Sequence, residues 1–250
     1  MRYKIPAVIA AVLWLAAARA YAQSGPSAAA QAAAPVDLTG YWVSLVTEDW
    51  RFRMLTPGKG DYAGVPLNAA ARKAADAWDP AKDEAAGEQC KSYGAPAVMR
   101  VPGRIHITWE NENTLRIDTD AGTQTRQLHF GGAQAPAGEP AWQGYSAAQW
   151  EYAGGPRARG PGELPKEGDL KVVTTHLRPG YLRKNGVPYS GNAALTEYYH
   201  RIVEPNGDAW LIVTTLVEDP QYLAQPFQTS THFKKQADAS GWDPTPCTSR

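Results

Sequence analysis

The sequence has no excess of charge of either sign. Its 250 residues carry 25 Lys and Arg against 25 Asp and Glu. Proteins that bind nucleic acid or an anionic membrane surface through their overall charge have a strongly basic balance. The neutral balance argues against both partners, and we expect a small molecule as ligand or substrate. A hydrophobic content of 43% and a charged content of 20% are typical of a globular protein rather than a disordered one.

Long hydrophobic runs are also missing, apart from one at the N-terminus. Arg2 and Lys4 precede the apolar run Ile5 to Ala17, and Ala20-Tyr21-Ala22 follows it as a small-x-small cleavage site. This order is that of a secretory signal peptide over residues 1–22. The run is short for a bilayer core of about 30 Å. We therefore predict a periplasmic or secreted protein with no integral membrane segment after cleavage.

Cysteine is scarce, with Cys90 and Cys247 alone in the chain. An even pair in an exported protein predicts a disulfide. Neither residue has a histidine nearby at metal-ligand spacing, so the pair is interpreted as structural.

The common catalytic motifs are absent as well. The sequence has no Gly-x-Ser-x-Gly elbow, P-loop, dinucleotide fingerprint, His-Glu-x-x-His motif or EF-hand loop. The sequence therefore gives little support for a dinucleotide-dependent enzyme, an ATP-dependent enzyme or a common hydrolase, and no cofactor is expected. A Ser-His-Asp triad built from distant positions stays open.

Short strand patterns dominate the rest of the chain and predict an all-β fold. Gln23 to Pro35 is predicted to be a flexible tether, and residues 36–250 a single domain. One helix is expected, over Asn68 to Trp78, with Asn68 as its N-cap. About eight to ten antiparallel strands must close into a barrel or form two packed sheets; we predict an up-and-down β-barrel. Strands are expected at 41–46, 50–55, 104–110, 114–119, 124–130, 170–177, 195–203, 210–217 and 227–235.

Two stretches carry further predictions. Residues 131–168 are rich in Gly, Pro and Ala, and predict a long loop or insertion that is exposed and mobile over Gly154 to Gly168. Asn206-Gly207 predicts a two-residue hairpin turn that pairs His200 with Val213. Both faces of these last strands mix polar and aromatic residues, which favours a barrel wall that lines a partly polar cavity.

Two resemblances accompany these patterns. The run Asp37-Leu38-Thr39-Gly40-Tyr41-Trp42 resembles the opening of calycins, the lipocalins and related barrels, in which the Trp of Gly-x-Trp closes the barrel floor. Residues 37–247 also look like a widespread family of exported bacterial proteins without an assigned activity. The matching segments are Cys90, residues 100–104, Trp142-x-Gly144-x-Ser146 with Trp150-Glu151, 169–175, 186–190, 195–197, 218–220, Tyr222 and Pro226. Many members run from Trp-Glu-Gly-Asp directly into the next strand, whereas here residues 152–168 intervene.

Candidate ligand-binding residues follow from the aromatic and basic side chains. The expected cavity is lined by Trp109, His129, His176, Tyr198 and His200. Trp142 and Trp150 are further candidates for stacking on a ligand, although core packing is the more common role of Trp. Arg178, Tyr181, Arg183, Lys184 and Tyr189 lie in one Gly- and Pro-rich loop, which at a barrel mouth can hold an anionic or phenolic group.

Three functions stay open. The first is binding of a small, partly apolar and aromatic molecule in the barrel. The second is a cofactor-independent lyase, isomerase or hydratase, in which His176 or His200 takes a proton and Tyr189 or Tyr198 holds an oxyanion. Glu197 serves there as acid or base if burial raises its pKa, and otherwise forms a salt bridge. The third is a structural module of the cell envelope. No metal site is assigned, although converging histidines would suit zinc or copper.

Overall fold

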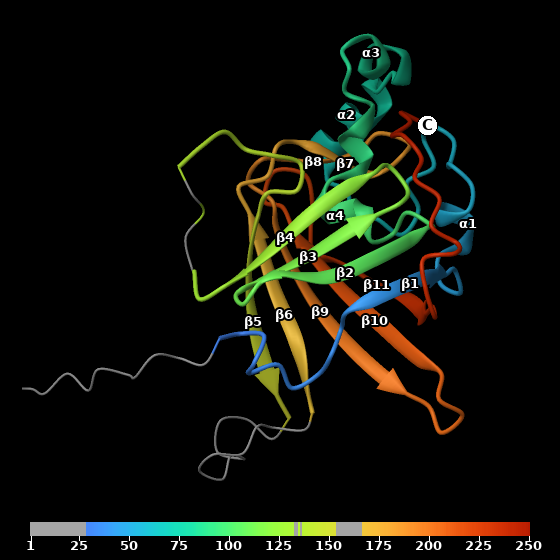
Figure 1. The fold of residues 1–250 in the computed structure, drawn as a ribbon. Helices are drawn as coiled ribbons and strands as arrows, with labels where there is room; N and C mark the ends of the chain where they lie inside the picture. Colours follow the sequence, from blue (N-terminus) through green and yellow to red (C-terminus); the bar gives the residue numbers. More distant parts are fainter. Residues whose placement is uncertain (1–28, 133–134, 136, 154–166) are drawn as a thin grey trace, which may run out of the picture.

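The protein is a closed β-barrel of nine strands with one end covered by short helices and a hairpin (Figure 1). The computed structural model describes residues 29–132, 135, 137–153 and 167–250. The strands follow the order β1-β11-β10-β9-β6-β5-β4-β3-β2, and β2 pairs with β1 to close the barrel. They are β1 (Gly40–Leu45), β2 (Arg104–Asn111), β3 (Thr114–Thr119), β4 (Gln124–Phe130), β5 (Tyr145–Tyr152), β6 (Gly168–Thr175), β9 (Ala194–Val203), β10 (Ala209–Glu218) and β11 (Phe227–Lys235).

The predicted all-β barrel is confirmed, with one difference in strand direction. β4 and β5 pair in parallel, whereas every other neighbouring pair in the barrel is antiparallel. A parallel pair needs a chain crossover from one end of the barrel to the other. Part of the Gly- and Pro-rich stretch after Phe130 supplies that crossover. The purely antiparallel prediction is therefore wrong at this one pair.

Two predicted segments adopt other structures. Trp50 to Leu55, predicted as a strand, begins with the short helix α1 (Trp50–Arg53). β5 forms inside the stretch that was predicted to be a loop. Its inward residues include Ser146 and Ala148, whose small side chains give a weak strand pattern. Residues 154–166 of the predicted mobile loop lie outside the described residues.

The predicted hairpin register is wrong by one residue. His200 pairs with Ile212 rather than Val213. The strands are joined by a longer loop, closed by bonds from Glu204 N to Asp208 O at 2.8 Å and from Gly207 N to Glu204 O at 2.9 Å. Asn206 Oδ1 accepts from Asp208 N at 2.9 Å, so its side chain serves this loop rather than a two-residue turn.

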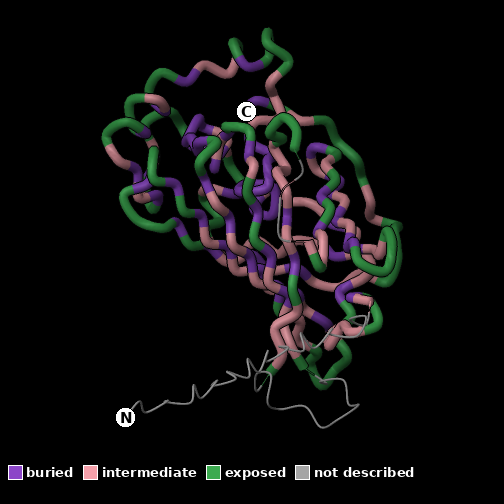
Figure 2. Tube along the Cα trace, turned by 90° about the vertical axis from the view of Figure 1, so that its left-hand side faces the viewer, coloured by how far each residue is buried: buried purple, intermediate pink, exposed green. Residues whose placement is uncertain are grey.

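Side chains alternate between the inside and the outside of the barrel, and buried positions recur at every second residue (Figure 2). The interior is filled by an apolar cluster that includes Ile107, Leu128 and Phe233. Trp42 is fully buried, and its Nε1 donates to Leu38 O at 3.0 Å. Lys235 Nζ lies 4.5 Å from the centre of the Trp42 ring. Trp42 belongs to this cluster, and the closed barrel is consistent with a calycin-like barrel.

Residues 29–38 run beside one end of the barrel (Figure 1). Trp150 Nε1 donates to Ala30 O at 2.9 Å, and Gln31 N donates to Glu112 O at 3.0 Å. Residues 29–35 of the predicted tether thus contact the barrel. The predicted signal peptide and the start of the tether lie outside the described residues. Within the described part of the chain, no helix is both long enough and apolar enough to cross a membrane.

The opposite end of the barrel carries the cap, which we define as residues 47–103 and 176–193 with the C-terminal segment (Figure 1). It contains a second apolar cluster. Asn68 Oδ1 accepts from Ala71 N at 2.9 Å, which confirms the predicted N-cap. Besides α1, the cap elements are α2 (Ala69–Ala77), α3 (Pro80–Ala85), the 3-10 helix η1 (Gln89–Tyr93), α4 (Ala95–Val98), β7 (Gly180–Arg183) and β8 (Val187–Tyr189).

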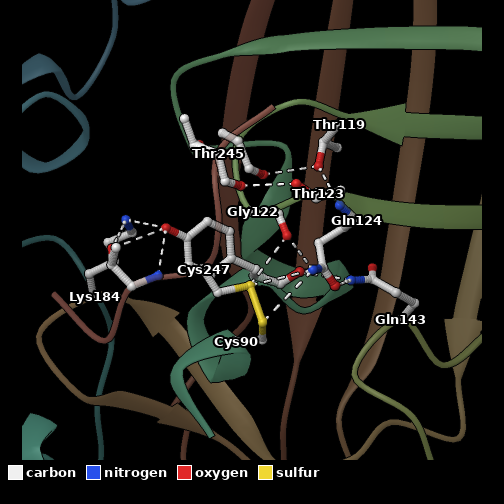
Figure 3. Close-up of a disulfide and its surroundings, with 12 residues drawn as sticks. Cys90, Thr119, Gly122, Thr123, Gln124, Gln143, Lys184, Thr245 and Cys247 are labelled. Carbon is white, nitrogen blue, oxygen red and sulfur yellow. Dashed lines mark hydrogen bonds between the residues drawn. A yellow bond between two sulfur atoms is a disulfide. The ribbon is translucent and has the colours of Figure 1, made fainter. Parts of the chain in front are cut away.

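The predicted disulfide is present between Cys90 and Cys247 (Figure 3). It joins η1 to the C-terminal segment across 157 residues of sequence. Gln124 Nε2 lies beside it and donates to Gly122 O at 2.6 Å. The same segment is held by a bond from Thr245 N to Asp120 O at 2.9 Å. The C-terminus is therefore fixed against the cap.

Candidate functional site

A pocket of about 420 Å³ lies within the cap, beside the turn between β3 and β4. Its wall comes from five parts of the chain that are far apart in sequence. α1 and the loop after it supply one side, η1 and α4 with the residues that follow them supply another, and the end of β7, the C-terminal segment and Ala121 complete it. A volume of this size is within the range of small-molecule sites, roughly 300–1,000 Å³.

Three buried arginines converge on this pocket, which we call the arginine pocket after them. Arg53, Arg100 and Arg183 are only 7%, 6% and 5% exposed, and all three line it. Arg53 Nε donates to Arg100 O at 2.9 Å, so these two are in direct contact. Arg183 Nη1 donates to Ala63 O at 2.7 Å.

Each of the three guanidinium groups keeps one buried N–H without a partner among the described residues. These donors are Arg53 Nη2, Arg100 Nη1 and Arg183 Nε. An unsatisfied buried donor costs about 1–3 kcal/mol, and more when it is charged. Among the described residues, the pocket wall contains no acidic residue. Arg53 and Arg100 pair with Glu48 and Asp49, which lie outside the wall, whereas Arg183 has no carboxylate within 4.0 Å in the described part of the chain.

The arginines also repel one another. Burial and the positive charge of Arg100 lower the pKa of Arg183 to about 10, against the opposing effects of Asp49 and Asp61. Burial and the charge of Arg100 likewise lower the pKa of Arg53, against the opposing effect of Glu48. Arg183 stays protonated at neutral pH because its pKa remains well above 7. An anion in the arginine pocket would relieve this repulsion.

The rest of the wall is mostly apolar. The guanidinium of Arg183 lies 4.2 Å from the ring centre of Phe52, which is part of the wall. The guanidinium of Arg100 lies 5.8 Å from the ring centre of Phe227, which is not part of the wall. Such stacking fixes the planes of the guanidinium groups. Other apolar side chains on the wall are Met54, Leu55, Pro57, Ala97, Val101, Pro102, Leu182 and Pro246. The arginine pocket thus combines a cationic group with a hydrophobic surface.

Tyr93 and Lys184 form the polar edge of the arginine pocket. Lys184 Nζ donates to Tyr93 Oη at 2.6 Å, and Thr248 N donates to the same oxygen at 3.3 Å. Burial alone would raise the pKa of Tyr93, but the hydrogen bonds and the charge of Lys184 outweigh it and lower the pKa below its ordinary value. Figure 3 shows Lys184 and its hydrogen bonds in the surroundings of the Cys90–Cys247 disulfide.

The structure places the predicted catalytic residues apart from one another. Glu197 is fully buried inside the barrel, where Arg126 binds both its oxygens, with Nη1 to Oε1 at 3.0 Å and Nη2 to Oε2 at 2.6 Å. The alternative of a salt bridge is therefore the one observed. Tyr198 and His200 face outward from the same strand, and His200 Nδ1 lies 2.5 Å from Asp169 Oδ1 with 53% of its side chain exposed.

The predicted histidines do not meet in one cavity either. His129 stacks on Tyr145 with ring centres 5.0 Å apart, and His129 alternates with the inward residues of β4. His176 Nε2 lies 2.8 Å from Gly138 O, on a backbone with φ of 59°. Among the described residues, no group of three or more His, Cys, Asp or Glu side chains could hold a metal ion.

The predicted aromatic and basic ligands divide between the two ends of the barrel. Trp109 and Trp150 form a cluster with Phe130 near residues 29–35, with the two indole centres 6.4 Å apart. Arg178 and Tyr181 belong to the cap, Trp142 contacts it, and all three have protein partners. Trp142 donates to Pro179 O at 3.2 Å, Arg178 pairs with Glu88, and Tyr181 donates to Asp83 at 2.9 Å.

Tyr189 is buried in the cap with no hydrogen-bond partner for its hydroxyl among the described residues, and burial raises its pKa. It does not line the arginine pocket. Arg183 and Lys184, from the same basic loop of the sequence, do line it. Two basic residues of this loop therefore lie on the pocket wall, whereas Arg53 and Arg100 were not among the predicted site residues.

Comparisons with known proteins add no assignment. The chain matches no family model and no curated protein. The arginine pocket is therefore assessed on its geometry and chemistry.

Proposed function

We propose that the protein is an exported binding protein of the periplasm or extracellular space, which takes a small organic anion with an aromatic or other apolar body into the arginine pocket. The observation that supports this most strongly is the convergence of Arg53, Arg100 and Arg183, each buried with a free N–H, on a wall without acidic residues. Hydrogen bonds from arginine to a carboxylate, sulfate or phosphate are stronger than hydrogen bonds between neutral groups, and their geometry is well defined. The apolar wall then holds the rest of the molecule.

The test uses a charged and an uncharged ligand of the same shape. We expect 2-naphthoate to bind and 2-naphthamide to bind at least about tenfold more weakly, because charged hydrogen bonds are worth about 1.5–3 kcal/mol. Isothermal titration calorimetry at low salt measures both affinities. Raising the ionic strength should weaken the binding of naphthoate more than that of naphthamide.

A pair of arginine variants locates the site. Arg183→Met should weaken 2-naphthoate binding by about 10- to 100-fold, because it removes a buried charged donor. Arg178→Met is the matched control, since Arg178 belongs to the same loop but pairs with Glu88 outside the arginine pocket. Equal affinities in both variants and the parent protein would refute this site. Circular dichroism melting confirms that each variant is folded.

The enzyme alternative has one observation in its favour. Tyr93 accepts hydrogen bonds from Lys184 and Thr248 at the edge of the arginine pocket, which favours its phenolate. A lyase or isomerase would use such a group as a base. In a binding protein, Tyr93→Phe should change the affinity for 2-naphthoate by less than about fivefold, since it removes one hydrogen-bonding group. Proton exchange at carbon in a bound ligand, lost in Tyr93→Phe and followed by NMR in D₂O, would instead establish the enzyme.

A further inference from the structure

We infer that the ligand head group is a phosphate monoester, a dianion with three terminal oxygens, rather than a carboxylate. This inference rests on the proposed function, that the arginine pocket binds an organic anion. It is carried by the number of uncompensated positive charges on the wall, and the number of guanidinium groups gathered there supports it.

The charges are counted from the ion pairs. Arg53 pairs with Glu48 and Arg100 pairs with Asp49, and neither acid is part of the pocket wall. Among the described residues, Arg183 and Lys184 take part in no ion pair within 4.0 Å. Two positive charges on the wall therefore lack a carboxylate. A carboxylate ligand would compensate one of them, whereas a phosphate monoester carries about −1.5 to −2 and compensates both.

The donors point to the same group. The three unpartnered N–H groups come from three different guanidiniums, Arg53, Arg100 and Arg183. A carboxylate has two oxygens and suits one bidentate arginine, as Glu197 shows with Arg126 in this same protein. A phosphate monoester offers a third terminal oxygen, so it can accept from more than one of the cationic groups on this wall. Lys184, which now donates only to the hydroxyl oxygens of Tyr93 and Thr248, adds a fourth cationic donor nearby.

The experiment compares three ligands that share one naphthyl body. 2-Naphthyl phosphate has three terminal oxygens and two charges, 2-naphthyl sulfate has three oxygens and one charge, and 2-naphthoate has two oxygens and one charge. Calorimetry at pH 7.5 and low salt should give the phosphate an affinity about tenfold above that of the sulfate, because the second charge meets an uncompensated cation. The sulfate should in turn bind more tightly than the naphthoate.

The pH dependence gives a second readout. The phosphate loses its second charge near pH 6, so its advantage over the sulfate should disappear between pH 7.5 and pH 5. The sulfate keeps its charge across this range, so any change in its affinity with pH comes from the protein and serves as the control. The ionisable groups around the site are chiefly Glu48, Asp49, Tyr93 and His232, whose Nδ1 lies 3.6 Å from Glu48 Oε2.

Lys184→Met provides the matching variant. Lys184 is partly exposed, so its loss should leave the fold intact. It should reduce the affinity for 2-naphthyl phosphate several-fold more than that for 2-naphthyl sulfate, because it removes one of the two uncompensated charges. Arg178→Met should leave the ratio of the two affinities unchanged.

The outcomes separate this inference from the proposed function. If the three ligands bind equally well, or the naphthoate binds best, the head group is not a phosphate and the proposed function stands. If none binds, both fail. Once phosphate preference is found, dodecyl phosphate below its micelle concentration and vesicles containing phosphatidic acid distinguish a soluble ester from a lipid head group.

Discussion

Replacing Arg126 with methionine is expected to lower the free energy of unfolding by about 3–5 kcal/mol, because it leaves the carboxylate of Glu197 buried and unpaired. Both side chains are 0% exposed inside the barrel. Tyr199 Oη and Thr174 Oγ1 lie 3.3 and 3.4 Å from the same guanidinium but cannot replace its charge. Urea unfolding followed by tryptophan fluorescence measures this loss. The free energy of unfolding depends linearly on urea concentration and is extrapolated to zero urea for each variant.

Two further variants show whether the loss comes from the unpaired charge. Arg126→Met with Glu197→Met should recover most of the stability, because it replaces both members of the pair with apolar groups. Arg116→Met removes a partly exposed arginine that pairs with Asp118 on β3, and should cost less than about 1 kcal/mol. A double variant no more stable than the single one would show that the residue volumes, rather than the charges, set the stability.

The position of this ion pair also bears on function. A carboxylate that is enclosed and bound at both oxygens is not free to exchange protons with a ligand, and Glu197 is not part of the arginine pocket. The barrel interior holds this ion pair together with the apolar cluster, and the proposed site lies instead in the loops and short helices of the cap. Binding sites commonly lie on such connecting segments.

The barrel itself could be predicted from sequence because strand periodicity is local. β2, β3 and β4 alternate apolar and polar residues and are separated by short polar turns, so their existence and order follow from nearby residues. β5 was not predicted because its inward residues Ser146 and Ala148 have small side chains, which give a weak strand pattern. Its parallel partner is also set by a long crossover that no local pattern encodes.

The arginine pocket could not be predicted in the same way. Arg53, Arg100 and Arg183 are 47 and 83 residues apart in sequence, and each alone is an ordinary basic residue. Their burial depends on the packing of α1 and β7 on the end of the barrel. The alternation of inward and outward side chains along β9 was predictable from sequence. It correctly placed Glu197 and Tyr199 on one face of the strand, and Tyr198 and His200 on the other. Which of the two faces was the interior depended on the closure of the barrel.

Loss of the disulfide should weaken both the fold and the site. In Cys90→Ser with Cys247→Ser, the free energy of unfolding should fall by up to about 4–5 kcal/mol, since the bridge closes a loop of 157 residues whose closure costs entropy in the unfolded chain. Melting of the variant and of the parent protein, with and without reductant, measures this. Reductant should lower the melting temperature of the parent alone, and an unchanged parent would contradict the stabilising role of the bridge.

The same variant should bind 2-naphthoate more weakly, for a reason separate from global stability. Cys90 precedes Ser92 and Tyr93 on one wall of the arginine pocket, and Cys247 lies between Pro246 and Thr248 on another. Without the bridge, the C-terminal wall keeps only its backbone and side-chain hydrogen bonds, such as that from Thr245 N to Asp120 O at 2.9 Å. The pocket must then be ordered on binding, which costs affinity. Calorimetry well below the melting temperature, where the variant is folded, should show this loss as a less favourable entropy of binding. An unchanged affinity would mean that the arginines are held in place by the cap alone.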